Sequence, residues 1–335
     1  MLRAQRAESI RARASHVVTR FLPLGLAGLL FLSVSKQVPS AVAALRNVHP
    51  YSLWSLVSFL AWNQVATLAW RSLLRGAGVR APALRELVRL KLEAQAVNQL
   101  VPTAGFAGEA LRAIRAAAPS EVGAASLATL LDNVAGTVTG LSLSIGATLL
   151  YLQARSGQSE LKELVLAATV AMFLVFVAAV VPFYFAASWL ERLSPTNPLR
   201  SVIAPFAERR AELRLAFRDA IALRFVERII AVSEIYIAFH AVGAPISLAA
   251  AALISSVFII VSMVVFFVPG QLGAAEAAVT MIGTLLGIPP ALGLSAALLR
   301  RARQLVVCGV GVTSLLLRKQ HGKPLHLRTS CEEAT

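Results

Sequence analysis

The sequence predicts an all-α polytopic membrane protein built from two inverted repeats, each with about three transmembrane helices and one re-entrant hairpin. Three observations lead to this prediction. Of the 335 residues, 57% are hydrophobic and 15% are charged, and the mean hydropathy is +0.71, which excludes an ordinary soluble domain. Two similar segments containing proline and glycine occur about half a chain apart. The arginines cluster beside apolar segments, as the positive-inside rule expects of cytoplasmic loops.

The two broken segments share a register. In VPTAGFAGEA, Glu109 follows Pro102 by seven residues, and in VPGQLGAAEA, Glu276 follows Pro269 at the same interval. Proline ends a helix because it lacks an N–H group and clashes with the preceding turn, and glycines allow the chain to reverse. Broken backbone at membrane depth needs protein or a water-filled cavity to satisfy its polar groups. The two breaks therefore predict one shared internal site between duplicated halves.

The first repeat is predicted at residues 21–152, after a basic cytoplasmic N-terminus at residues 1–20. Its first span, residues 21–35, is interpreted as a signal anchor. A cleavable signal peptide is the alternative, because Ala41-Val42-Ala43 imitates a cleavage site. The second span, residues 51–70, has a tryptophan near each end, where the membrane interface favours that residue.

A hairpin is predicted next, at residues 84–115. It is too polar to span the membrane twice, and basic residues lie at both of its ends, so it enters and leaves on the cytoplasmic side. The third span, residues 122–152, is long enough to tilt and contains Asp132 and Asn133. Its Gly136-x-x-x-Gly140 motif is suited to close helix packing.

The second repeat is predicted at residues 164–317 and begins with a span at residues 164–186. A basic, amphipathic segment at residues 199–224 is interpreted as an interfacial helix on the cytoplasmic surface, or equally as a linker helix packed on the protein's own loops. The fifth span, residues 226–243, contains Glu234 and His240. A hydrogen-bonded packing role is expected for this histidine ahead of a proton relay.

A second hairpin at residues 248–288 and a last span at residues 291–317 complete the repeat. Basic residues mark the tail, residues 318–335, as cytoplasmic, and the basic loop before Val226 is cytoplasmic too. With both termini in the cytoplasm and six full spans, the second hairpin enters from outside and the halves are inverted. Residues 248–268 are long enough to cross alone, which would reverse the last helix.

Charged and break-forming residues at membrane depth are the candidates for function, because a charge at the bilayer centre costs about 2.5 to 3.5 kcal/mol. The candidate lipid-binding residues are Asn98, Pro102, Glu109, Arg112 and Asp132 in the first half, and Pro269, Gly270, Gly273, Glu276, Arg300 and Arg303 in the second. Arg300, Arg301 and Arg303 outnumber Glu276, which leaves positive charge for a phosphate that arginine binds bidentately. The alternative is a buried ion pair between Glu276 and Arg300 or Arg303.

Two residue patterns also carry a family resemblance. They comprise Asn98, Pro102, Gly108, Glu109 and Arg112, and Pro269, Gly270, Leu272, Gly273 and Glu276. Together they resemble the two signatures of the lysylphosphatidylglycerol synthase transmembrane family, which includes flippase-like uncharacterised membrane proteins, and the resemblance covers nearly the whole chain. It implies a bacterial inner-membrane protein that moves or binds polar lipids. One branch of similar size is associated with hopanoid biosynthesis.

The chain departs from the family pattern in two places. Gln271 stands where a second glycine is common, and Leu131-Asp132-Asn133 stands where relatives carry a Glu-Arg pair, which questions the charge pairing of the first half. The chain ends soon after its last span and has no counterpart of the soluble domain that transfers lysine. Lysyl transfer is therefore not expected, and the protein is predicted not to be an enzyme.

The function predicted from these observations is a lipid transporter or flippase. A headgroup enters between the inverted halves, its phosphate meets Arg300, Arg303 or Arg112, and Glu109 and Glu276 act as gates or proton carriers. The alternative is an accessory membrane protein, or a membrane enzyme, of a polyprenyl, hopanoid or other lipid pathway. An aspartate-rich diphosphate–Mg²⁺ motif is excluded, because the sequence contains only two aspartates.

The expected partners are membrane lipids, with a second copy of the chain or a lipid-synthesis protein as further candidates. Nucleic acid is not expected despite a net charge of +15, because only 7% of residues are aromatic and basic cytoplasmic loops explain the charge. Cys308 lies in an apolar run and Cys331 in the polar tail. They predict neither a disulfide scaffold nor a metal centre, and no cofactor is predicted.

Overall fold

A computed structural model of the chain describes residues 49–101, 106–154, 209–264 and 273–320, together with Gln271 and a few isolated positions. The regular structure in these ranges is helical, which confirms the all-α prediction for them. The α-helices are α3 (Trp54–Gly76), α4 (Leu84–Leu100), α5 (Phe106–Ala116), α6 (Val122–Ala154), α9 (Arg210–Ala241), α10 (Leu248–Val264), α11 (Ala274–Leu285) and α12 (Pro290–Gln320), and two short 3-10 helices are η1 (Pro50–Leu53) and η2 (Pro119–Glu121).

Several predicted features lie outside the described residues. They are the span at residues 21–35, nearly all of the span at residues 164–186, the candidate residues Pro102, Pro269 and Gly270, and the tail beyond Gln320.

The helix ends follow local chemistry. Helix α4 ends at Leu100, and Val101 is already extended, with φ −105° and ψ 124°, because the residue before a proline is pushed out of the helical region. The turns that follow α3 and α9 use Gly78 and Gly243, at φ +80° and +78°. Glycine adopts this left-handed conformation without a steric penalty. Helix α12 begins at Pro290, which suits the first turn of a helix because its missing N–H needs no partner there.

Helix α9 differs from the prediction. The sequence predicted an interfacial helix at residues 199–224 and a separate span at residues 226–243, but residues 210–241 form one continuous helix. No proline or glycine lies between Arg210 and Ala241, so no residue interrupts the backbone hydrogen bonds where the polarity changes. The predicted position of its basic N-terminal half at the membrane surface stays a prediction.

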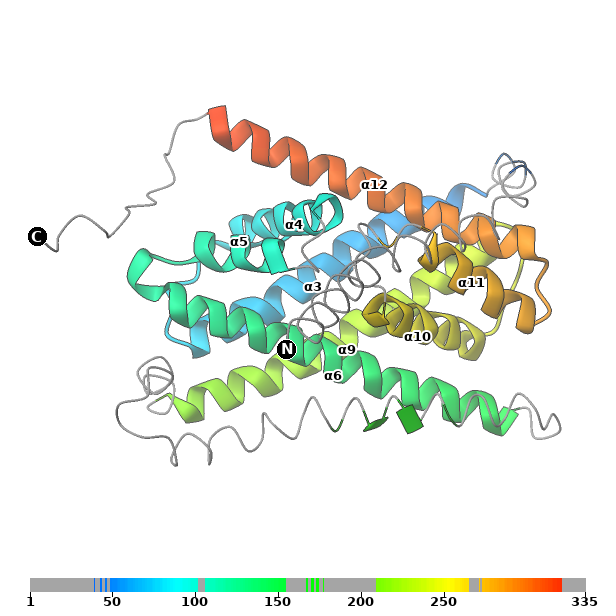
Figure 1. The fold of residues 1–335 in the computed structure, drawn as a ribbon, viewed down its shortest axis with the longest axis horizontal. Helices are drawn as coiled ribbons and strands as arrows, with labels where there is room; N and C mark the ends of the chain where they lie inside the picture. Colours follow the sequence, from blue (N-terminus) through cyan, green and yellow to red (C-terminus); the bar gives the residue numbers. More distant parts are fainter. Residues whose placement is uncertain are drawn as a thin grey trace, which may run out of the picture.

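The helices of the two halves match in length and pack reciprocally (Figure 1). Helices α4 and α10 have 17 residues each, α5 and α11 have 11 and 12, and α6 and α12 have 33 and 31. Helix α4 packs against α12, and α10 packs against α6. The helix before each break, α4 or α10, thus lies against the long helix of the other half, α12 or α6. Helices α3 and α9 pack along each other.

The described helices enclose two apolar cores. Around α3, the buried side chains of Trp70, Leu73, Leu87 and Leu131 come from α3, α4 and α6. The other core contains Phe239, Ile254, Val279 and Ala296, from α9, α10, α11 and α12. The first core also contains Ala216 and Ala220 of α9, so α9 takes part in both cores and joins the two halves.

By length and composition, one helix in the described ranges can cross a membrane, over residues Pro119–Tyr151. The segments Leu248–Ser262 and Ala274–Leu285 are apolar but shorter. The six crossings, the re-entrant hairpins and the inverted orientation of the halves stay predictions.

Candidate functional site

The break of the first half is held by Asn98 and Gly108. The backbone N–H of Gly108 in α5 donates a hydrogen bond to the Asn98 side-chain oxygen in α4, at 2.8 Å. A Cβ atom added at Gly108 would lie 2.2 Å from the Ala94 carbonyl oxygen. Because real Cβ atoms never approach a carbonyl so closely, only glycine allows the two arms to touch here.

Arg112 is the centre of an ion-pair cluster in the first half. It forms ion pairs with Glu109 and with Asp132, whose Oδ2 lies 2.9 Å from Nη1, and it donates to the Asn133 side-chain oxygen at 3.1 Å. Its guanidinium lies over the Trp70 ring, 4.8 Å from the centroid. The residue is 2% exposed, so all of its hydrogen-bonding capacity is directed at the protein's own groups.

Asp132 extends this cluster to α9. Its Oδ1 lies 2.6 Å from Arg224 Nη2, and Arg224 Nη1 lies 2.6 Å from Glu227 Oε2. The carboxylate of Asp132 is fully buried, and such a charge is tolerated when it is paired. The doubt about charge pairing in the first half was therefore wrong, because Asp132 finds its partners on α5 and α9.

The residues Arg224 and Glu227 were missing from the predicted site. Arg224 lies at the end of the segment interpreted as an interfacial helix, where an arginine is expected to face water. Their spacing of three residues places both on one face of a helix, and this was the available signal. Which neighbour that face meets depends on the packing of α9 against α6.

Glu276 has two roles in the second half. One carboxylate oxygen accepts a hydrogen bond from the Gly273 backbone N–H at 2.9 Å and thereby caps α11, and Gly273 has φ +79°. The other oxygen lies 3.0 Å from Arg301 Nε. The alternative drawn from the sequence was an ion pair of Glu276 with Arg300 or Arg303. The partner in the structure is Arg301, because this residue lies on the face of α12 that meets α11.

Arg303 pairs instead with Glu234 of α9. Arg303 Nε lies 3.0 Å from Glu234 Oε1, although the two groups are not aligned for a hydrogen bond. The Arg303 guanidinium also lies over the Phe59 ring, 4.9 Å from the centroid. Glu234 therefore joins the site as a residue that the predicted list lacked.

Arg300 differs from its two neighbours. Its guanidinium lies 3.6 Å from the centroid of the Phe258 ring, and its Nη1 is buried without a hydrogen-bond partner in the structure as described. No described carboxylate lies within ion-pair distance of it. An aromatic face stabilises a cation without neutralising it, so the positive charge of Arg300 is available to an anion.

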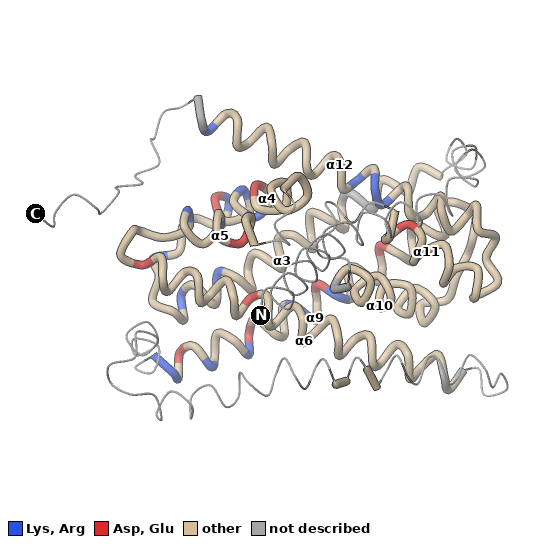
Figure 2. The backbone as a smooth tube through the Cα atoms, in the orientation of Figure 1, with Lys and Arg blue, Asp and Glu red and all other residues tan. Residues whose placement is uncertain are grey.

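These second-half charges line a cavity of about 590 Å³ with walls from α3, α4, α9, α10, α11 and α12. Its charged lining consists of Arg228, Glu234, Glu276, Arg300, Arg301 and Arg303. Figure 2 shows the basic part of α12 beside the acidic residue of α11. Four arginines face two glutamates, an excess of two formal positive charges in a chamber large enough for a polar headgroup.

The predicted site residues thus fall into two groups. Asn98, Glu276, Arg300 and Arg303 line the cavity, whereas Glu109, Arg112 and Asp132 belong to the closed cluster of the first half, and Gly273 is the N-cap of α11. Within the described ranges, no three His, Cys, Asp or Glu side chains are placed to hold a metal ion.

Comparison with known proteins gives one match. The family described as lysylphosphatidylglycerol synthase TM region matches residues 16–311 of the chain. No curated protein and no solved structure matches it. The match is to a transmembrane region and covers most of the chain, including both hairpin signatures.

Proposed function

Because the chain belongs to the lysylphosphatidylglycerol synthase transmembrane family, a family of membrane proteins related to lipid metabolism, we propose that its central cavity binds the phosphate-bearing headgroup of a polar lipid and that the protein moves this lipid across the membrane. The observation that carries the proposal is the excess of two positive charges around the cavity of about 590 Å³. A lipid phosphodiester neutralises one of them and accepts hydrogen bonds from the other arginines.

Arg300 is the residue proposed to meet the phosphate. The carboxylates of Glu276 and Glu234 already neutralise Arg301 and Arg303. A buried guanidinium nitrogen without a hydrogen-bond partner is costly, and a phosphate oxygen is the acceptor that Arg300 lacks. Asn98 and Gln95 of α4 also line the cavity and would bind the uncharged part of a headgroup.

The reciprocal packing supports the proposed mechanism of movement. The cavity is lined by α3 and α4 of the first half and by α9, α10, α11 and α12 of the second half. If the two halves are inverted repeats, rocking one half against the other opens such a chamber alternately to the two sides of the membrane. The ion pairs Glu276–Arg301 and Glu234–Arg303 join three helices around the chamber, and their exchange with a phosphate would couple binding to this movement.

The test compares lipid binding and lipid translocation in Arg300→Gln. Native mass spectrometry of the purified protein would count retained lipids, and proteoliposomes with a fluorescent phosphodiester lipid would measure translocation. We expect at least a roughly tenfold loss in both, since a lost charge-assisted contact is worth about 1.5 to 3 kcal/mol. The matched control is Arg85→Gln, which removes an exposed arginine outside the cavity.

The outcomes separate the proposal from its alternatives. Binding without translocation in the wild-type protein would favour an accessory lipid-binding protein. Retention and translocation that do not change in Arg300→Gln would overturn the headgroup site.

A further inference from the structure

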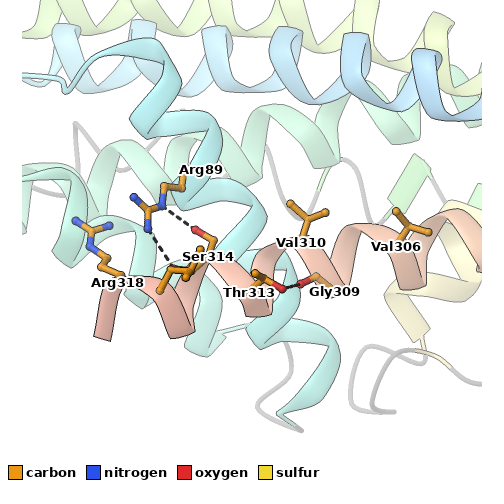
Figure 3. Close-up of a pocket in the computed structure, with 8 residues that line it drawn as sticks. Arg89, Val306, Gly309, Val310, Thr313, Ser314 and Arg318 are labelled. Carbon is orange, nitrogen blue, oxygen red and sulfur yellow. Dashed lines mark hydrogen bonds between the residues drawn. The ribbon is translucent and has the colours of Figure 1, made fainter. Parts of the chain in front are cut away.

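A second opening lies along α12, apart from the central cavity. It is an open groove of about 830 Å³ between α12 and α4 (Figure 3). Its lining shares no residue with the lining of the central cavity. Any ligand of this groove therefore belongs to a separate site.

One end of the groove is cationic. Arg89 and Arg318 line it, and their side chains are 39% and 37% exposed. The carboxylate between them, Glu93, is fully buried and accepts hydrogen bonds from Ser314 at 2.7 Å and from Arg115 at 2.7 Å. Glu93 lies 3.2 Å from Arg89 and is hidden behind it, whereas the nearest carboxylate to Arg318 is the partly exposed Glu86, at 2.9 Å.

The charged residues at this end of the groove carry a formal net charge of +1, because three arginines face two glutamates. Its arginines are Arg89, Arg115 and Arg318, and its glutamates are Glu86 and Glu93. Arg89 also donates to the Ser314 hydroxyl at 2.7 Å and to its carbonyl at 3.1 Å, so its position is set by α12 (Figure 3). A single phosphodiester group has the charge that complements this arrangement.

The end of the groove away from the arginines is apolar, and Thr313 and Ser314 lie between the two ends. Val306 and Val310 line the apolar end and are 55% and 51% exposed. From Val306 to Arg318 the helix rises about 18 Å at 1.5 Å per residue, close to the roughly 15 Å of one hydrocarbon leaflet. A groove of this length, with an apolar end and two arginines at the other end, has the dimensions of one acyl chain below its phosphate.

We propose that the groove beside α12 binds an anionic phospholipid, with its phosphodiester against Arg89 and Arg318 and one acyl chain along Val306 and Val310. Such a lipid would act as a structural ligand that joins α12 to α4 at the membrane surface. The proposal does not depend on transport through the central cavity.

Two glycines on α12 show which side of the helix faces α4 and which faces the groove, and one of them can be substituted to fill the groove. A Cβ atom at Gly311 would lie 2.4 Å from the Leu92 carbonyl oxygen, so this glycine faces α4. A Cβ atom at Gly309 would have no atom within 4 Å, and Gly309 lines the groove. Gly309→Phe therefore adds a ring on the groove side of α12, where its Cβ has open space. Gly146→Phe in α6, where an added Cβ also meets nothing within 4 Å, is the matched control.

The experiment measures binding of phosphatidylglycerol and phosphatidylcholine with identical chains to purified protein, by native mass spectrometry and thermal melting. It is done in wild-type and Arg300→Gln backgrounds, so that lipid in the central cavity is counted separately. We expect Gly309→Phe and Arg318→Gln each to lose one phosphatidylglycerol in both backgrounds, with affinity roughly fivefold weaker or more, since each arginine near a lipid surface contributes about 1 kcal/mol. Arg85→Gln and Gly146→Phe should match the wild type.

Four results would overturn the proposal. They are unchanged retention in both groove variants, equal binding of phosphatidylcholine, equal stabilisation by glycerol phosphate without chains, and a dimer that Gly309→Phe dissociates without any loss of lipid.

Discussion

The two halves of the protein place charges at matching positions but use them differently. Glu109 and Glu276 both lie in the first turn of the helix after a break, and a long helix follows each. In the first half the arginine beside the glutamate is enclosed by carboxylates and an amide. In the second half the arginines line a cavity, and two of them, Arg228 and Arg300, have no described anionic partner within ion-pair distance. One half stabilises the fold with its charges, and the other keeps positive charge exposed to a chamber.

The difference can be traced to two positions. Arg112 follows Pro102 by ten residues, and Val279 follows Pro269 by the same number. Asn133 follows Pro102 by 31 residues, and the position 31 residues after Pro269 is Arg300. The first half therefore places its cation on the short helix, where it can reach the following long helix. In the second half the cation, Arg300, is on the long helix, and the corresponding position of the short helix is Val279. A valine side chain cannot accept a hydrogen bond from the guanidinium group.

The largest effect is expected from Asp132→Asn. This change leaves Arg112 and Arg224 without their shared carboxylate in a fully buried place, and breaking a buried ion pair costs about 3 to 5 kcal/mol of unfolding free energy. Membrane abundance and thermal stability should both fall. The control is Asp219→Asn, whose pair with Arg218 is exposed and should cost less than about 1 kcal/mol. Normal abundance with lost translocation would place function in the first half as well.

A smaller loss is expected from Glu276→Gln, about 2 to 3 kcal/mol. Glutamine still accepts the Gly273 hydrogen bond that caps α11, but it leaves Arg301 without its charge partner, which lowers the cost below that of a fully broken buried pair. Thermal melting of Glu276→Gln and of the double variant Glu276→Gln with Arg301→Gln measures the effect. The double variant should recover stability. A single variant that is stable but does not translocate would instead make Glu276 a functional group.

The close contact within the first hairpin is tested by Gly108→Ala. The added methyl group would lie 2.2 Å from the Ala94 carbonyl oxygen, and such overpacking costs about 1 to 3 kcal/mol. Gly146→Ala, where the methyl group meets nothing within 4 Å, should gain up to about 1 kcal/mol from helix propensity. Chemical or thermal unfolding measures both. Equal stability of the two variants would mean that the arms of the hairpin are not tightly packed.

The smallest change in stability is expected from Arg300→Gln, within about 1 kcal/mol of the wild type. Arg300 has no ion pair to lose in the described structure, and its removal relieves a buried, unsatisfied nitrogen. Its contact with Phe258 is the opposing contribution. Removing one buried charge should therefore destabilise the protein when the charge is Asp132, but affect only lipid binding when the charge is Arg300. A loss as large as that of Asp132→Asn would remove the contrast between the halves.

The sequence by itself determined the helical class, the breaks and the family. These features depend on local chemistry, which a sequence shows directly. The apolar composition indicates that the chain lies in a membrane. Pro102 ends α4 at Leu100, and the shared proline-to-glutamate interval identifies both predicted hairpins. Helices α4 and α10 begin at Leu84 and Leu248, where the hairpins were predicted to begin.

Only the tertiary structure decided which charges meet. Arg300 and Arg301 are neighbours in the sequence, but successive residues on a helix point about 100° apart. Both residues line the cavity, but the rotation of α12 places Arg301 against Glu276 of α11 and Arg300 against the Phe258 ring of α10. The pairing of Asp132 with Arg224 joins residues 92 positions apart, and no local pattern encodes it. It follows from the packing of α6 on α9. The burial of apolar faces determines this packing, and the charged groups that it buries are then stabilised by pairing with each other.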